Sequence, residues 1–252
     1  ELETRKVATV LAQLGIRTLL LKGNALGQWL YPESWLRPCS DIDLLFESRA
    51  EAERAATGFA ALGYSLAFSP AASNYEMTCR LMVGGKSRGE LDLHWRLVNS
   101  PAYAGRFTFE ELWSTSIALP VLGNGLKALG PLHALAHACL NRALDLQMSG
   151  ADPLKLLYDL HLFLQRMDAA DWRRFLDLAR RKNLCGLCLR SFDDAVAAFD
   201  APLPEEVRRA LANHATLEPI SGQRLHDWRH MQWHNLKAIP GTWAKLAWLR
   251  DK

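Results

Sequence analysis

Hydrophobic and polar positions along residues 1–97 change period several times. Stretches with apolar residues three or four apart, typical of amphipathic helices, alternate with short apolar runs bounded by glycine, typical of buried strands. The pattern predicts helices at 1–14, 24–31 and 49–62, strands at 18–21, 41–46 and 64–68, and a hairpin formed by 74–83 and 90–97 around 84–86. A second, shorter hairpin is expected at 116–129, turning at 123–125.

From residue 131 onward the strand pattern nearly disappears and helical spacing takes over. We expect helices at 131–147, 153–167, 169–182, 185–199 and 204–214, each followed by residues that can end a helix. The change predicts an α+β protein with two domains. The first, residues 1–125, is an α/β domain with a mixed sheet, and the second, residues 126–252, is all-helical.

Composition excludes some classes of protein but does not identify a binding partner. The chain has 252 residues, 49% of them hydrophobic, and a formal net charge of +3, which is too mild for a dedicated nucleic-acid binder. The five cysteines include one C-x-x-C pair, Cys185 and Cys188, with no second ligand pair near it, so we expect free thiols and a cytoplasmic location. No apolar run approaches the roughly 18 residues of a membrane span.

Carboxylates flanked by apolar residues mark two of the expected strands. Asp41 and Asp43 are two residues apart, so both side chains project from the same face of a strand. Such close like charges repel unless a cation lies between them, and Mg²⁺ or Mn²⁺ accepts oxygen ligands of this kind. Asp92, between Leu91 and Leu93, would complete a metal-binding triad if its strand lies beside the first.

A turn that suits phosphate binding precedes the first carboxylates. Gly23 lies between an expected strand and an expected helix, where a glycine lets the backbone approach a phosphate and helix amides point toward it. Asn24 follows it, and Lys22 and Arg37 are positioned in the sequence to add charge-assisted contacts to phosphates. These residues and the three aspartates are the parts of a phosphoryl-transfer site.

The motifs resemble a known family at five places in the first half. They are L-K-G-x-A-L at 21–26, Y-P at 31–32, L-R-P-x-x-D-I-D-L-L at 36–45, A-L-G-Y at 61–64 and D-L-H-W-R at 92–96. The sequence is similar to the bacterial group called uncharacterised nucleotidyltransferases, within the DNA polymerase beta-like nucleotidyltransferase superfamily. It departs from the wider superfamily in having Gly-Asn in place of Gly-Ser or Gly-Gly, and a longer interval before Asp41.

The resemblance implies a polymerase-beta-like catalytic domain followed by a helical domain that binds the acceptor or another partner. The implied activity is Mg²⁺-dependent transfer of a nucleoside monophosphate from an NTP, ATP among them, to an unidentified small molecule, protein or RNA. Asp41 and Asp43 would ligate the metal, Asp92 would complete the site and help to deprotonate the acceptor, and Lys22 and Gly23 would hold the triphosphate. The alternatives are a toxin-like enzyme that modifies tRNA and a module that senses nucleotide without turnover; an RNA acceptor is allowed but not favoured.

Several candidates in the first half also have structural interpretations. The alternative for Lys22 is that it only extends from a strand end to solvent, and the alternative for Arg37 is that it neutralises Asp41 or Asp43. His94 shares a face with Asp92 and would contact substrate or act as a base, although a hydrogen-bonded structural histidine is the favoured interpretation. Trp35 and Trp95 are expected to pack rather than stack on a base.

The helical half carries weaker candidates. His133 and His137 have a metal-ligand spacing but no third ligand in the sequence. Asp159 and His161 lie in an apolar helix, where we expect pairing across the helix interface, with a wall of the acceptor pocket as the alternative. Near the end, histidines and tryptophans recur among basic residues in 226–248. The alternatives there are a surface for RNA or a membrane and, as the favoured interpretation, a helix that packs its tryptophans on the domain.

Overall fold

The computed structural model describes residues 1–68, 75–123, 125–149, 154–225 and 227–250. Its backbone contacts divide the chain into two compact units, the first comprising Glu1–Asn99 with Phe107–Gly130 and the second Ser100–Arg106 with Pro131–Lys252. The domain boundary expected at residues 125–126 stays a prediction.

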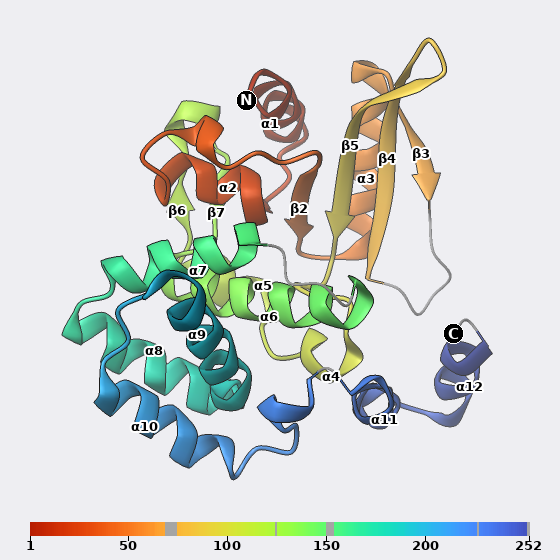
Figure 1. The fold of residues 1–252 in the computed structure, drawn as a ribbon. Helices are drawn as coiled ribbons and strands as arrows, with labels where there is room; N and C mark the ends of the chain where they lie inside the picture. The colour runs from red at the N-terminus through yellow and green to blue at the C-terminus, as the bar shows by residue number, and fades with distance from the viewer. Residues whose placement is uncertain (69–74, 124, 150–153, 226, 251–252) are drawn as a thin grey trace. The chain divides into compact units, whose positions relative to one another are not determined.

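A seven-stranded sheet in the order β3-β4-β5-β2-β1-β7-β6 forms the framework of the first unit (Figure 1). The strands are β1 (Thr18–Leu20), β2 (Ile42–Phe46), β3 (Tyr64–Phe68), β4 (Glu76–Val83), β5 (Lys86–His94), β6 (Ile117–Ala118) and β7 (Lys127–Ala128). Strands β2 and β5 run parallel, as do β1 and β7, and the other neighbours are antiparallel. The expected α+β class with a mixed sheet is confirmed.

Four helices belong to the same unit, and local signals account for the ends of the longer ones. They are α1 (Leu2–Leu14), α2 (Lys22–Trp29), α3 (Arg49–Phe59) and α5 (Phe109–Ser114). Gly15 ends α1 with a φ of 65°, a left-handed conformation that glycine adopts without a Cβ clash. Ser48 begins α3 by accepting a hydrogen bond from the Glu51 amide. The short helix α5 was not expected from the sequence.

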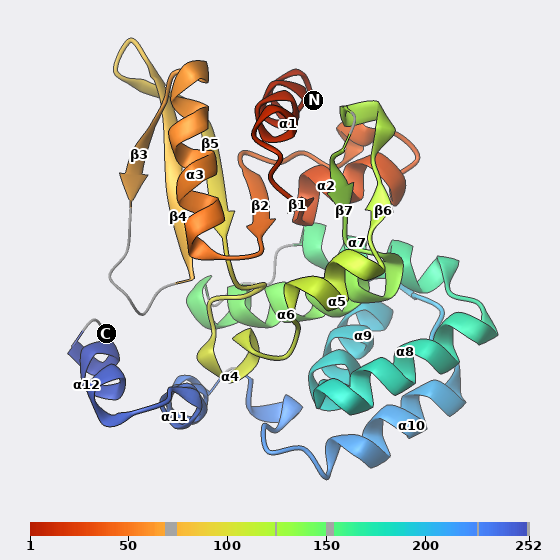
Figure 2. The same cartoon turned by 180° about the vertical axis from the view of Figure 1, so that it is seen from behind.

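The two faces of the sheet have different neighbours. Alternate residues of β2, including Leu44 and Phe46, belong to a buried apolar cluster with side chains of α1 and α3. Figure 2 shows α1 and α3 in front of the strands, whereas α2 lies on the other side in Figure 1. Asp43 lies between Ile42 and Leu44 on β2, so its side chain projects from the face opposite the cluster.

The β4–β5 hairpin turns at two glycines. Gly84 and Gly85 have φ values of 59° and 76°, which the tight turns of two-residue hairpins require. Since the turn takes only these two residues, β5 begins at Lys86 rather than at residue 90, and it ends at His94 rather than at residue 97. The hairpin is confirmed, with its second strand shifted toward the turn.

The described residues of the second unit form helices and the loops between them, with no strand. Its helices are α4 (Pro101–Ala104), α6 (Pro131–Ser149), α7 (Leu154–Arg166), α8 (Ala169–Lys182), α9 (Cys185–Phe199), α10 (Glu205–Ala215), α11 (Trp228–Ala238) and α12 (Thr242–Arg250). Asp168 and Asp171 form a reciprocal capping box at the start of α8, and Asn183 ends that helix in the left-handed conformation. None of the described helices is both long and apolar enough to cross a membrane.

The expectation that tryptophans pack on their domain is wrong for most of those considered. Trp248 is buried, but Trp35, Trp228, Trp233 and Trp243 are between 56% and 86% exposed.

Cys185 and Cys188 are buried free thiols, as expected, and burial raises the pKa of Cys185 to about 12. His226 and the start of the expected helix at residue 153 lie outside the described residues.

Candidate active site

Strand register brings polar side chains into one row across the sheet. Because β2 and β5 are parallel neighbours, Asp43 lies opposite Asp92. The antiparallel pairing of β4 with β5 places Thr78 opposite Asp92 and Glu76 opposite His94. Directly opposed residues project from the same face of a sheet, so three neighbouring strands supply this polar row.

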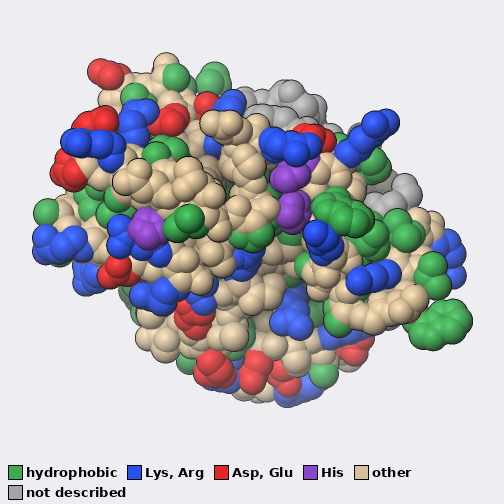
Figure 3. Space-filling view, turned by 90° about the horizontal axis from the view of Figure 1, so that it is seen from below, with side chains coloured by type: hydrophobic (Ala, Val, Ile, Leu, Met, Phe, Trp, Pro, Cys, Tyr) green, Lys and Arg blue, Asp and Glu red, His purple; other side chains and the backbone are tan. Residues whose placement is uncertain are grey.

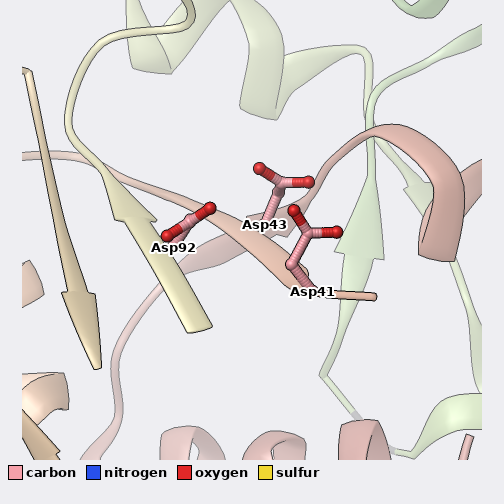
Figure 4. A group of neighbouring side chains, drawn as sticks. All are labelled: Asp41, Asp43 and Asp92. Atoms are coloured by element: carbon pink, nitrogen blue, oxygen red, sulfur yellow. The ribbon is translucent and has the colours of Figure 1, made fainter. Parts of the chain in front are cut away.

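Asp41 precedes β2 and joins Asp43 and Asp92 in a compact group. One carboxylate oxygen from each lies within 4.8 Å of the other two (Figure 4). Within the described part of the chain, no other group of three histidine, cysteine or acidic side chains has this spacing. Three carboxylates so close together suit a hard divalent cation, which takes oxygen ligands and offsets their repulsion.

Lys22 reaches this group from the first position of α2, two residues after β1. Its backbone has a φ of 49°, a conformation that non-glycine residues rarely adopt, and its Nζ lies 2.6 Å from Asp43 Oδ1. The Leu21 amide donates to the Asp43 carbonyl oxygen at 2.9 Å, which fixes the two strands at this point. The ammonium therefore neutralises part of the negative charge of the triad.

His94 lies between two carboxylates and is buried. Its Nε2 is 3.0 Å from Asp43 Oδ1 and its Nδ1 is 3.1 Å from Glu76 Oε2. Burial lowers the pKa of the imidazole, but the two carboxylates outweigh burial and raise that pKa to about 9. These contacts are those of a structural histidine that carries a proton near neutral pH; a contact with substrate stays a prediction.

Asp43 and Asp92 face each other yet have pKa shifts in opposite directions. For Asp43, burial opposes ionisation, but Lys22 and His94 hold its pKa well below the usual range. For Asp92, burial raises the pKa and the nearby Asp43 charge adds to the effect, while the Thr78 hydroxyl, which donates at 2.7 Å, lowers it. The site thus pairs a firmly ionised carboxylate with a more basic one.

The expected phosphate-binding residues surround the loop that leads to Asp41. The Asn24 side-chain amide donates to the Asp41 carbonyl oxygen at 2.5 Å. Gly23 lies so close to Arg37 that a Cβ there would be 3.0 Å from the guanidinium Nη1. Arg37 is buried and donates to the Pro38 carbonyl at 3.1 Å. The turn and the loop are therefore packed together, and their contacts with a phosphate stay predictions.

Two small pockets lie beside these residues. One, of about 250 Å³, is lined by Gly23, Asn24 and Arg37 together with exposed Trp35. The other, of about 310 Å³, is polar and has Asp41 in its wall. The Gly-Asn turn thus borders one pocket, and Asp41 borders the other.

Sequence reasoning missed Glu76 and Thr78, the residues of β4 that contact His94 and Asp92. Both lie in a segment that was correctly expected to be a strand. Their pairing partners follow from the hairpin register, which depends on where the turn begins. A hairpin that turns on Gly84-Gly85 without a bulge would align Thr78 with Leu91. The register shift between Leu81 and Met82 aligns Thr78 with Asp92 instead, and the sequence does not indicate that shift.

Some candidates of the second unit have defined contacts, whereas the pairing expected for Asp159 and a metal at His133 and His137 stay predictions. Arg142, which is buried, lies 2.6 Å from Asp194 on α9. His161 stacks on Tyr158, with ring centroids 5.7 Å apart. Asp159 is buried on α7, and a role of this helix in binding an acceptor stays a prediction.

Comparison with known proteins places the chain in a family. The model of a family described as uncharacterised nucleotidyltransferase matches residues 1–216. The chain is also similar to a solved structure, an antigenic nucleotidyltransferase-like protein from Paracoccidioides brasiliensis, at 14% identity and a TM-score of 0.45, over 83% of this chain and 90% of that one. No curated protein matches. Since the family model covers most of its length, the chain belongs to the uncharacterised nucleotidyltransferase family.

Proposed function

We propose that the protein transfers a nucleoside monophosphate from an NTP to an acceptor, using a divalent cation held by Asp41, Asp43 and Asp92. The observation that carries the proposal is the approach of these three carboxylates to within 4.8 Å, inside the segment that matches the family. The acceptor oxygen would form a bond to the α-phosphorus, and the bond from that phosphorus to pyrophosphate would break. When bound, Mg²⁺ or Mn²⁺ would activate the attacking oxygen and neutralise the leaving pyrophosphate.

The residues around the carboxylates have distinct proposed roles. Lys22 and His94 keep Asp43 ionised as a ligand by pairing with its Oδ1. Asp92 accepts the proton of the acceptor hydroxyl, and its raised pKa makes it the more basic of the two opposed aspartates. Thr78 orients that carboxylate through its 2.7 Å hydrogen bond.

The nucleotide is proposed to bind beside the Gly-Asn turn. Gly23 and Asn24 line a pocket of about 250 Å³, and buried Arg37 borders it with a permanent positive charge. Lys22 is within reach of a phosphate that bridges the site, because its ammonium already lies at Asp43. The helical unit is proposed to bind the acceptor.

Transfer of labelled nucleotide tests the proposal. The protein is incubated with each of the four α-³²P NTPs, Mg²⁺ and cell extract, and RNA, protein and small molecules are then separated. We expect label in one of these fractions, dependent on the divalent cation and lost in Asp41→Asn. Label in RNA would identify the tRNA-modifying alternative within the same chemistry.

Two results would contradict the proposal. Nucleotide transfer by the Asp41→Asn variant at the wild-type rate would show that the reaction does not need the three carboxylates. Binding of NTP by calorimetry without any release of pyrophosphate, in the presence of extract, would identify a nucleotide-sensing module instead. A matched control, Glu53→Gln, changes an exposed carboxylate of α3 to an amide and should leave transfer unchanged.

A further inference from the structure

The last two helices have a composition unlike the rest of the chain. From Trp228 to Arg250 the sequence contains four tryptophans and four Lys or Arg residues but no Asp or Glu. The family match ends at residue 216, so this stretch lies outside the segment shared with the family model. Its chemistry is therefore not explained by the nucleotide site.

An apolar stripe lies on the exposed side of α12. Trp243, Leu246 and Leu249 are spaced three residues apart, so they share one side of the helix, and they are 86%, 54% and 52% exposed. Trp248, in contrast, is only 7% exposed and anchors the other side of the helix. We call Trp243, Leu246 and Leu249 the α12 stripe; its exposed apolar surface is unusual for a helix in water.

Helix α11 is oriented by buried contacts within its own unit. Asn235 Oδ1 accepts hydrogen bonds from Ser100 Oγ at 2.7 Å and from the Ala102 amide at 3.2 Å. Met231, one turn earlier, is fully buried. Trp233 lies on the opposite side, 56% exposed, with the Lys237 ammonium 4.8 Å from its ring centroid.

Basic residues accompany the exposed apolar side chains. Arg229 and Lys237 are exposed on α11, and Lys245 and Arg250 lie on α12. Figure 3 views the protein from below, and in its right half blue basic and green hydrophobic side chains lie next to one another. With no acidic residue between Trp228 and Arg250, the side chains of this stretch contribute only positive charge, which complements an anionic partner.

The aliphatic residues of the stripe decide between the anionic partners. Single-stranded nucleic acid stacks its bases on aromatic rings, for which the exposed leucines have no use. A membrane interface accepts tryptophan and leucine into its apolar boundary and attracts lysine and arginine to anionic headgroups. We propose that α11 and α12 bind the surface of an anionic lipid membrane, with Trp243, Leu246 and Leu249 entering the interface.

Vesicle sedimentation with the whole chain tests this inference. Wild-type protein is mixed with phosphatidylcholine vesicles, with or without phosphatidylglycerol, and the bound fraction is measured after centrifugation. We expect binding to the anionic vesicles that is at least about tenfold stronger than to neutral ones and that weakens with added salt. The combined change of Trp243, Leu246 and Leu249 to serine should reduce it at least about tenfold.

Two matched variants test whether vesicle binding depends on the α12 stripe itself rather than on exposed apolar residues in general or on misfolding. Changing Leu2, Val83 and Val121, three exposed apolar residues of the first unit, to serine should leave binding unchanged. Lys245→Gln with Arg250→Gln leaves the stripe intact and should lower the preference for anionic vesicles severalfold.

Three outcomes would overturn the inference. They are an absence of wild-type binding to anionic vesicles, equal binding by the stripe variant with a native circular-dichroism spectrum, and tighter binding of a single-stranded RNA that depends on the same three residues. The last would assign the surface to nucleic acid.

Discussion

The two faces of β2 share one backbone, but one is wholly apolar and the other carries a carboxylate beside Leu45. One face presents Leu44 and Phe46 to the apolar cluster with α1 and α3. The other presents Asp43, which lies opposite Asp92 and contacts Lys22 and His94. Buried apolar contacts stabilise the strand regardless of exact chemistry, whereas a buried carboxylate is tolerated only with charged partners.

Within this five-residue strand, the apolar face therefore contributes to stability and the face with Asp43 contributes to the proposed chemistry. The apolar face holds the strand in place, and the polar face can then keep like charges close together. Changes on the two faces should consequently affect different measurements, and Asp92, whose ionised form the fold disfavours, should separate the two most clearly.

The largest effect is expected for Asp92→Asn. Loss of a metal ligand and proton acceptor should lower kcat for nucleotide transfer about 10³-fold or more. Since the fold raises the pKa of Asp92, the ionised carboxylate is less favourable in the folded than in the unfolded chain, and the amide should leave the free energy of unfolding unchanged or higher. Initial rates of label transfer and urea denaturation check the two halves of this prediction.

A large fall in stability with normal kinetics would contradict that assignment and make Asp92 a structural residue. Glu53→Gln, an exposed amide substitution on α3, serves as the control for both measurements.

On the other face, Leu44→Ala should lower the free energy of unfolding by about 2–5 kcal/mol, because it removes a fully buried side chain and leaves a cavity. The rate of transfer per folded molecule should change far less than in Asp92→Asn. Denaturant unfolding followed by circular dichroism measures the loss. Leu44→Met, which keeps most of the volume, should cost less than about 1.5 kcal/mol, and equal losses for both variants would show that the cluster does not hold β2.

The smallest effect concerns pH. His94 has a folded-state pKa of about 9 against 6.5 for a free histidine, so the stability it contributes is fully present below pH 6.5 and is lost as the pH rises through 9. Between these values the wild type should lose up to about 3 kcal/mol more unfolding free energy than His94→Gln. Denaturation curves recorded with EDTA across this range test the difference, and parallel pH profiles for the two proteins would refute the charge on His94.

Much of the framework could be predicted because its signals are local. Gly15 and Ser48 end and begin helices by their own conformations or hydrogen bonds, and the Asp168 capping box does the same in the helical unit. Apolar neighbours indicated that Asp43 and Asp92 lie on strands, and convergence with Asp41 was predicted on the condition that the two strands pair, as β2 and β5 do.

The rest of the fold and of the site could not be predicted, because it depends on the pairing register of strands and on which side chains are exposed to solvent. Glu76 reaches His94 only through the pairing of β4 with β5, and no residue near Glu76 in the sequence indicates that contact. The exposure of Trp243 and Trp233 was also missed, because tryptophans at helical spacing look the same in sequence whether they face a core or water.

The central claim is that three carboxylates of the first unit form a divalent-cation site, and Mn²⁺ binding tests it without knowledge of the acceptor. Free Mn²⁺ is measured by electron paramagnetic resonance during titration of the wild type and of the double variant Asp41→Asn with Asp92→Asn. The account predicts saturable binding by the wild type and affinity at least about tenfold weaker in the folded double variant. Equal Mn²⁺ affinity in the two proteins would contradict it.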